Sequence, residues 1–301
     1  MILITIWPLF ALICLGFILA RSQFPSTAFW PAADKINYFV LFPALLVSSL
    51  ANAPVTDPAV FRLGGAAILT ILIAAGLALL FRRARPMPAA RFGPILQGVI
   101  RFNTYLGFAV ITAVGGSEGV ARAAVYLAIA VPLVNVLSII ALTKKTGEQQ
   151  GRLLVKTILR NPLILACLLG IAIALSGIGL PFGLGAFFGL LAQGSLPLGL
   201  LCVGAALQPA SLRHDSRALA ASGVARLLLM PCLAFLVGRL FGLSGTEALV
   251  LIVFSAIPTA PTSYVLTKQL SGDGAFMAGI ITAQTLLAVL TLPLILMVFG
   301  G

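Results

Sequence analysis

Long apolar segments alternate with short polar segments along the whole chain. Each apolar segment is about 20 residues long, the length that a helix needs to cross the hydrocarbon core of a bilayer. The pattern therefore predicts ten membrane-spanning helices. They are expected at residues 1–20, 35–50, 59–81, 92–114, 118–143, 160–176, 183–207, 218–241, 246–270 and 274–299.

Composition agrees with the pattern, since 60% of the 301 residues are hydrophobic and only 9% are charged. A soluble domain is typically about 45–50% apolar and about 25% charged, so the predicted fold class is an all-α integral membrane protein. Residues 1–20 lack a basic segment before the apolar run, so we interpret them as a first spanning helix and not as a signal peptide. The four cysteines lie in apolar runs without paired spacing, so no disulfide, metal site or cofactor is predicted.

A net charge of +12 can indicate a nucleic-acid partner, but here the basic residues cluster in short loops between apolar runs. Alternating the loops between two sides places the clusters at 82–91 and 144–156 on one side. The other side keeps only Arg62, Arg122 and Arg239. Basic loops remain on the cytoplasmic side of a membrane. We therefore expect a multi-pass protein of the cytoplasmic (inner) membrane, with both termini extracytoplasmic and no nucleic-acid partner.

Two of the predicted helices contain signals for a break. Residues 255–264 read Ser-Ala-Ile-Pro-Thr-Ala-Pro-Thr-Ser-Tyr, and a helix cannot continue unbroken through both prolines. In the 92–114 helix the signal is weaker, because it relies on Asn103, Thr104 and Gly107 without a proline. Freed backbone groups inside a bilayer must be buried in protein or line a wet cavity, so broken helices are typical of transport sites. The alternative is a proline kink in an ordinary spanning helix.

An offset of about 155 residues aligns the second half of the chain with the first. Pro43 then falls beside Pro197, Asn103-Thr104 on Pro258-Thr259, and Glu118 on Asp273. Five helices per half give the two copies opposite orientations in the membrane. We therefore expect a first five-helix repeat at 1–143, a cytoplasmic basic loop at 144–156, and a second, inverted five-helix repeat at 157–301.

Four motifs resemble those of the auxin efflux carrier family, which includes the plant PIN proteins and bacterial relatives that carry organic anions. They are Arg101-Phe102-Asn103-Thr104-Tyr105, Val131-Pro132-Leu133-Val134-Asn135, Asn161-Pro162-Leu163 and Ile257-Pro258-Thr259-Ala260-Pro261-Thr262-Ser263. The resemblance implies ten helices in two inverted repeats, with helices 4 and 9 broken and crossing at mid-membrane. Residues 106–109 lack the proline that many members carry, and the long central loop of the plant exporters is absent, so auxin itself is not implied.

The candidate substrate-binding residues lie at the two predicted breaks and in three other predicted helices, which contain Asn135, Arg226 and Gln284. Arg101 and Arg226 each lie deep in a spanning helix, where a guanidinium would pair with a carboxylate or extend to the interface. The other candidates are Asn103, Thr104, Gly107, Asn135, Pro258, Thr259, Pro261, Thr262 and Gln284. Their polar groups would contact substrate, satisfy freed backbone groups, or bond between helices.

An enzyme is not expected, because the apolar segments contain no carboxylate pair, no histidine and no Ser/His/Asp set. The predicted function is a secondary transporter that exports small organic anions by alternating access. All seven acidic residues are expected in loops or first turns, which favours an electrogenic carrier without a coupling ion. A proton- or sodium-coupled symporter of the bile-acid type and a non-transporting receptor remain alternatives. The sequence leaves open whether the protein forms a homodimer.

Overall fold

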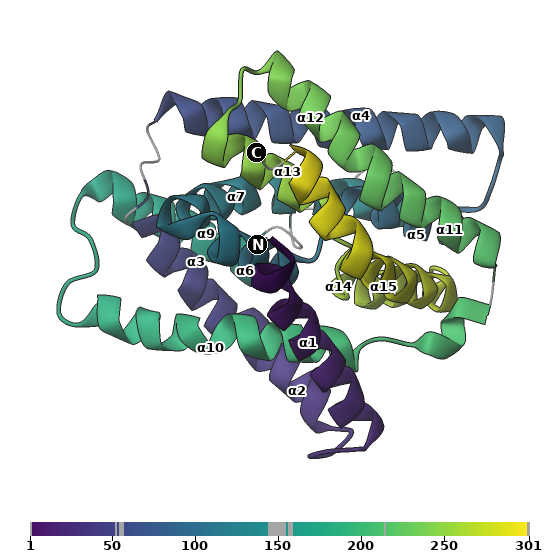
Figure 1. Cartoon of the computed structure of the whole chain (residues 1–301), viewed down its shortest axis with the longest axis horizontal. Coiled ribbons are helices and arrows are strands. Elements are labelled where there is room, and N and C mark those ends of the chain that lie inside the picture. The colour runs from purple at the N-terminus through teal and green to yellow at the C-terminus, as the bar shows by residue number, and fades with distance from the viewer. Residues whose placement is uncertain are drawn as a thin grey trace.

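The computed structural model describes residues 2–51, 53, 57–143, 155, 159–213 and 215–299, and every regular element in these ranges is a helix (Figure 1). In chain order they are α1 (Ile2–Arg21), α2 (Phe29–Ile36), η1 (Asn37–Leu41), α3 (Phe42–Ala51), α4 (Pro58–Ala84), α5 (Ala89–Ile100), α6 (Thr104–Val114), α7 (Gly116–Leu142), α9 (Pro162–Ser176), α10 (Leu184–Ala205), η2 (Pro209–Arg213), α11 (Ser216–Val224), η3 (Ala225–Leu229), α12 (Met230–Leu240), α13 (Gly245–Ala256), α14 (Thr262–Gln269) and α15 (Gly274–Phe299). The predicted loop 144–156 lies outside the described residues except for position 155.

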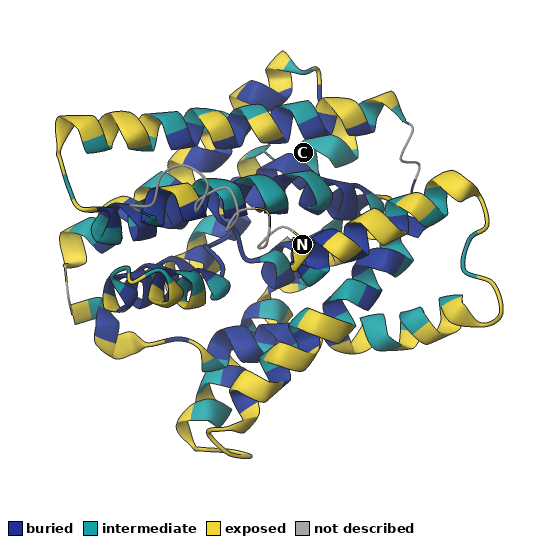
Figure 2. Ribbon diagram, turned by 180° about the vertical axis from the view of Figure 1, so that it is seen from behind, coloured by how far each residue is buried: buried dark blue, intermediate teal, exposed yellow. Residues whose placement is uncertain are grey.

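Eight helical segments of the described chain are long and apolar enough to cross a membrane, which supports the predicted class of an all-α integral membrane protein. They are Leu3–Arg21, Phe29–Ala51, Pro58–Ala84, Ala89–Val114, Gly116–Leu142, Leu184–Ala205, Ser216–Leu240 and Gly274–Phe299. Two shorter apolar helices, α9 and α13, lie where the sequence predicts two further spans. Many large apolar side chains on the outer helix faces are exposed, as expected for a surface that meets lipid (Figure 2).

The second span begins at Phe29, and the prediction of a start at Lys35 is wrong. Residues 29–34 lie outside the predicted helix, but tertiary packing keeps this stretch helical. The side chain of Trp30 is buried against α10 beside Cys202, and the Ser195 hydroxyl of α10 donates to Asn37 Oδ1 at 2.9 Å. Asp34 therefore lies within a spanning segment, contrary to the expectation that every acidic residue would fall in a loop or a first turn.

The chain leaves the helical conformation twice inside apolar segments, at residues 101–103 and 257–261. The two links touch, because the Asn103 N–H donates to the Pro258 carbonyl at 2.8 Å. Asn103 Oδ1 also accepts from the Leu106 N–H and so caps α6. The first link ends before Gly107, which lies inside α6. A Cβ there would sit 2.5 Å from the Phe254 ring, so this glycine permits close packing against α13 and does not form the link.

The helices pack as two groups (Figure 1). In the first group α1 and α2 lie against α10, and α3 packs on both α9 and α10. In the second group α4, α5 and α13 pack on α7, α12 packs on α4 and α13, and α15 contacts α5, α11, α13 and α14. The groups meet where α7 contacts α9 and α3, and where α6 contacts α1 and α10. Both nonhelical links belong to the second group.

Ion pairs join the starts of several helices. Arg122 on α7 pairs with Asp57 at 2.6 Å, Glu247 at 3.1 Å and Glu118 at 3.7 Å. The Ala59 N–H and the Arg122 guanidinium stabilise the ionised Asp57 carboxylate and lower its pKa below the usual value. This cap of α4 therefore stays ionised to lower pH than a free aspartate. A second cluster joins Arg91 to Asp215 and Asp273, the residues that precede α11 and α15.

Candidate functional site

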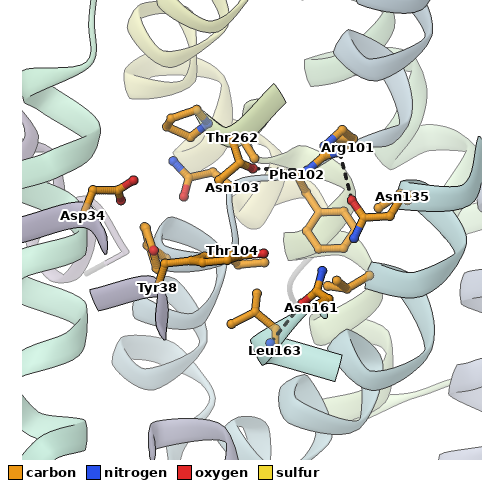
Figure 3. A pocket seen from close by; sticks show the side chains of 15 residues that line it. Asp34, Tyr38, Arg101, Phe102, Asn103, Thr104, Asn135, Asn161, Leu163 and Thr262 are labelled. Atoms are coloured by element: carbon orange, nitrogen blue, oxygen red, sulfur yellow. Dashed lines mark hydrogen bonds between the residues drawn. The ribbon is translucent and has the colours of Figure 1, made fainter. Parts of the chain in front are cut away.

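A narrow cavity lies where the two links meet and where the two helix groups face each other (Figure 3). Its lining residues are Asp34, Tyr38, Arg101, Phe102, Asn103, Thr104, Tyr105, Val131, Val134, Asn135, Asn161, Leu163, Ala260, Pro261 and Thr262. The space open to the centre of a water molecule is about 40 Å³. Since one water needs roughly 10–15 Å³ on this measure, the cavity holds a group of about the size of a carboxylate.

Arg101 lies in the first link, where its backbone is extended, and its side chain faces the cavity (Figure 3). One terminal nitrogen donates to Asn135 Oδ1 at 2.9 Å and the other donates to Thr262 Oγ1 at 3.1 Å. The residue is only 8% exposed, and none of the described ion pairs involves it. Arg101 Nε has no hydrogen-bond partner among the described residues, nor does Asn103 Nδ2. The cavity wall therefore presents a buried positive charge and spare donors.

Three helices begin at the cavity. Asn103 precedes α6, Asn161 precedes α9 and Pro261 precedes α14, and all three line the wall. The Asn161 side chain accepts from the Leu163 N–H at 2.9 Å, which caps α9 (Figure 3). A helix N-terminus carries a partial positive charge from its unpaired N–H groups. The three ends therefore add to the positive potential of Arg101, and the site is suited to an anion.

Six of the predicted site residues come together in this wall: Arg101, Asn103, Thr104, Asn135, Pro261 and Thr262. They come from the two links, from the first residues of α6 and α14, and from α7. The other five, Gly107, Pro258, Thr259, Arg226 and Gln284, do not line the cavity. Each of them instead packs or bonds behind it, as their contacts show.

Arg226 is 1% exposed and binds the backbone at the far side of the two links. Its side chain donates to the carbonyls of Val99, Phe254 and Ile257, which lie at or next to the C-terminal ends of α5 and α13. Helix C-termini carry unpaired carbonyls and a partial negative charge. Arg226 thus stabilises the two helix ends that lead into the links, and we assign it to support of the links.

Gln284 and Thr259 form a second brace between the links. The Gln284 side chain accepts from the Thr259 N–H at 2.9 Å and donates to the Gly98 carbonyl at 2.9 Å. The Thr259 hydroxyl donates to the Gln97 carbonyl at 3.0 Å. Both side chains are fully buried, and their polar groups bond backbone atoms of both interrupted helices.

Sequence reasoning missed the contribution of the first helix group to the cavity. Asp34 and Tyr38 line it from α2 and η1, opposite Arg101 and Asn135 (Figure 3). Tyr105 of α6 lies beside the Asp34 carboxylate. Asp34 and Tyr38 are four residues apart, a spacing that places two side chains on the same face of a helix. This signal could have been used only if the stretch from residue 29 had been recognised as helical.

Comparison with known proteins identifies the family. The sequence matches the family described as membrane transport protein over residues 1–296. The chain belongs to this family. It is the auxin efflux carrier family that the four motifs resemble, so the recognition from sequence is confirmed.

Two curated members are similar to the chain. One is an uncharacterized transporter of Methanothermobacter thermautotrophicus, 25% identical over 294 residues that cover 96% of each chain. The other is an uncharacterized transporter of Methanocaldococcus jannaschii, 26% identical over 209 residues, 67% of this chain and 66% of the relative. Membership of the auxin efflux carrier family identifies a multi-pass membrane transporter and argues against an enzyme.

Proposed function

We propose that the protein is a carrier that exports small organic anions across the cytoplasmic membrane. One observation carries the proposal: a buried arginine with a spare donor lies where three helix N-termini converge on one cavity. Such a wall favours an anion, and the guanidinium fork of Arg101 matches the geometry of a carboxylate. Asn103, Thr104, Asn135, Pro261 and Thr262 would form the rest of the binding site.

Alternating access is supported by the position of the cavity. One wall comes from α2, η1 and α9, and the other comes from the links, α6, α7 and the start of α14. Movement of one helix group against the other would therefore open the cavity to each side of the membrane in turn. The present cavity admits a carboxylate head but not the rest of most acids, so the groups would have to separate for substrate to enter.

We also propose that ten helices form two inverted repeats, with helices 4 and 9 crossing at the links. Three pairs of helices start 158 residues apart: α4 and α11 at Pro58 and Ser216, α6 and α14 at Thr104 and Thr262, and α7 and α15 at Gly116 and Gly274. The contact between Asn103 and Pro258 joins the two interruptions. An interrupted helix in each half is common in secondary transporters.

The placement of the helix ends also bears on a sodium-coupled alternative. A sodium ion would need oxygen ligands, and carbonyls at interrupted helix ends are common ones. Here Arg226 binds such carbonyls of α5 and α13.

The proposal of an uncoupled, electrogenic carrier depended on the absence of a carboxylate from the spanning helices, and Asp34 removes that argument.

Transport by purified protein in proteoliposomes tests the proposed function. With a panel of labelled monocarboxylates and dicarboxylates, we expect uptake of at least one acid and none of the matching neutral amides. Parallel reactions with and without sodium separate the bile-acid-type alternative, because a sodium symporter would require that ion. Absence of flux and of thermal stabilisation for every acid would favour a receptor for another class of ligand.

The predicted orientation can be checked independently. The basic residues of loops 82–91 and 144–156 would lie in the cytoplasm and both termini outside. A reporter that is active only in the cytoplasm should therefore be silent when fused after Gly301 and active when inserted after Pro86. The opposite result at both positions would reverse the assignment.

A further inference from the structure

We propose that Asp34 is the proton-binding residue of this site, so that a carboxylate enters the cavity together with a proton. The inference rests on the proposed function and adds its coupling ion. It is carried by the placement of one carboxylate, within a spanning segment, in the same small cavity as the buried Arg101.

Asp34 lines two neighbouring cavities. The first is the site cavity, and the second is bordered by Trp30, Pro31, Asp34, Cys202, Val203, Ala205, Ala206 and Pro261. Asp34 and Pro261 are the lining residues that the two cavities share. The second cavity lies between the beginning of α2 and the end of α10, helix ends that the charge pattern assigns to the cytoplasmic side. The Asp34 carboxylate is therefore placed between the site and a route towards the cytoplasm.

The groups around Asp34 leave its charge without a direct counter-ion. Tyr38 follows it on the next helical turn, Tyr105 faces it from α6, and Cys202 faces it from α10. None of the described ion pairs includes Asp34, and the adjacent Lys35 is exposed. Arg101 is the one cation among the described lining residues, and it lies across the cavity (Figure 3).

Charge balance then links substrate to proton. With Asp34 ionised, Arg101 and Asp34 together give the empty cavity a net charge of about zero. Adding a carboxylate leaves one uncompensated negative charge in a poorly hydrated space, which is unfavourable. Protonation of Asp34 restores neutrality: a proton from water forms an O–H bond with the carboxylate, and this bond breaks when substrate and proton leave on the other side. A monocarboxylate carried this way moves no net charge.

Transport with controlled gradients tests the coupling. For the monocarboxylate of the panel that is taken up fastest, a pH gradient at zero membrane potential should drive accumulation by the wild type. In Asp34→Asn, the pH gradient should lose its effect and any remaining flux should follow the membrane potential. Asp34→Glu should retain pH-driven accumulation, and Glu118→Gln, which alters an exposed carboxylate at the start of α7, should behave as wild type.

These outcomes separate the two proposals. If no acid is transported under any gradient, the proposed function fails. If the wild type transports an acid but its accumulation responds only to the membrane potential, the proposed function is supported and the proton-coupling inference is overturned. Wild-type coupling in Asp34→Asn would also overturn it, because another group would then carry the proton.

A fluorescence titration tests proton binding without any substrate. Trp30 lies one helical turn before Asp34 in the second cavity and is 8% exposed, whereas Trp7, the other tryptophan, is exposed. In the Trp7→Phe variant, the fluorescence emission of Trp30 should change in one step as the pH is varied within about pH 4–9. A carboxylate that changed protonation only outside this range would not bind and release protons at the pH values found in cells. The step should vanish with Asp34→Asn and persist with Glu118→Gln. A step that survives Asp34→Asn, or no step in the parent, would contradict the inference.

Discussion

Replacing Arg101 with alanine is expected to abolish transport of an organic anion while leaving the protein folded and inserted. The side chain supplies the cavity's positive charge, with two of its nitrogens held by Asn135 and Thr262 and Nε left without a partner. Truncating one partner of a buried charge pair costs about 2–5 kcal/mol, so the Kd should rise by at least about 30-fold. Arg101→Lys keeps the charge but loses the planar fork, and should give an intermediate Kd.

Flux at equal protein level and equilibrium binding would measure the effect. Arg62→Ala removes the same charge from an exposed position on α4 and serves as the matched control.

Asn103→Ala should also abolish transport, because it removes both a cavity donor and the α6 cap, which contributes about 1 kcal/mol. Wild-type flux in Arg101→Ala and Asn103→Ala would refute the site.

Replacing Arg226 with methionine should instead destabilise the protein. The substitution leaves the carbonyls of Val99, Phe254 and Ile257 without their donor in the interior of the molecule. An unpaired buried polar group costs about 1–3 kcal/mol, and breaking a buried charged contact costs about 3–5 kcal/mol. We expect the apparent melting temperature in detergent to fall by roughly 10 °C, since each kcal/mol shifts Tm by about 2–4 °C in domains of about 150–250 residues.

Arg101→Met is the matched comparison for this prediction. Both substitutions remove a buried guanidinium, but Arg101 binds side chains that line a cavity, whereas Arg226 binds helix-terminal carbonyls. Arg101→Met should therefore lose binding with little change in melting temperature. Equal melting temperatures for wild type and Arg226→Met would show that the links are held mainly by other contacts, such as those of Gln284.

The sequence by itself determined the class of the protein and the region of the site. Apolar segments of spanning length can be satisfied only in a bilayer, and the closely spaced Pro258 and Pro261 prevent one helix from continuing through both. These constraints are local, so they can be read from neighbouring residues. They also located Arg101, Asn103 and Thr262 near the interruptions, and the structure brings these three residues to one cavity together with Asn135 of α7.

Only the tertiary structure decided which buried polar groups face the cavity. Arg101 and Arg226 look alike in sequence, since both are arginines deep in apolar segments. They differ because Arg101 lies by the N-termini of α6 and α14, and Arg226 by the C-termini of α5 and α13. Asp34 was expected in a loop because the predicted helix began at Lys35, but burial of Trp30 against α10 keeps that stretch helical. Such contacts join residues far apart in the chain, and local patterns carry no information about them.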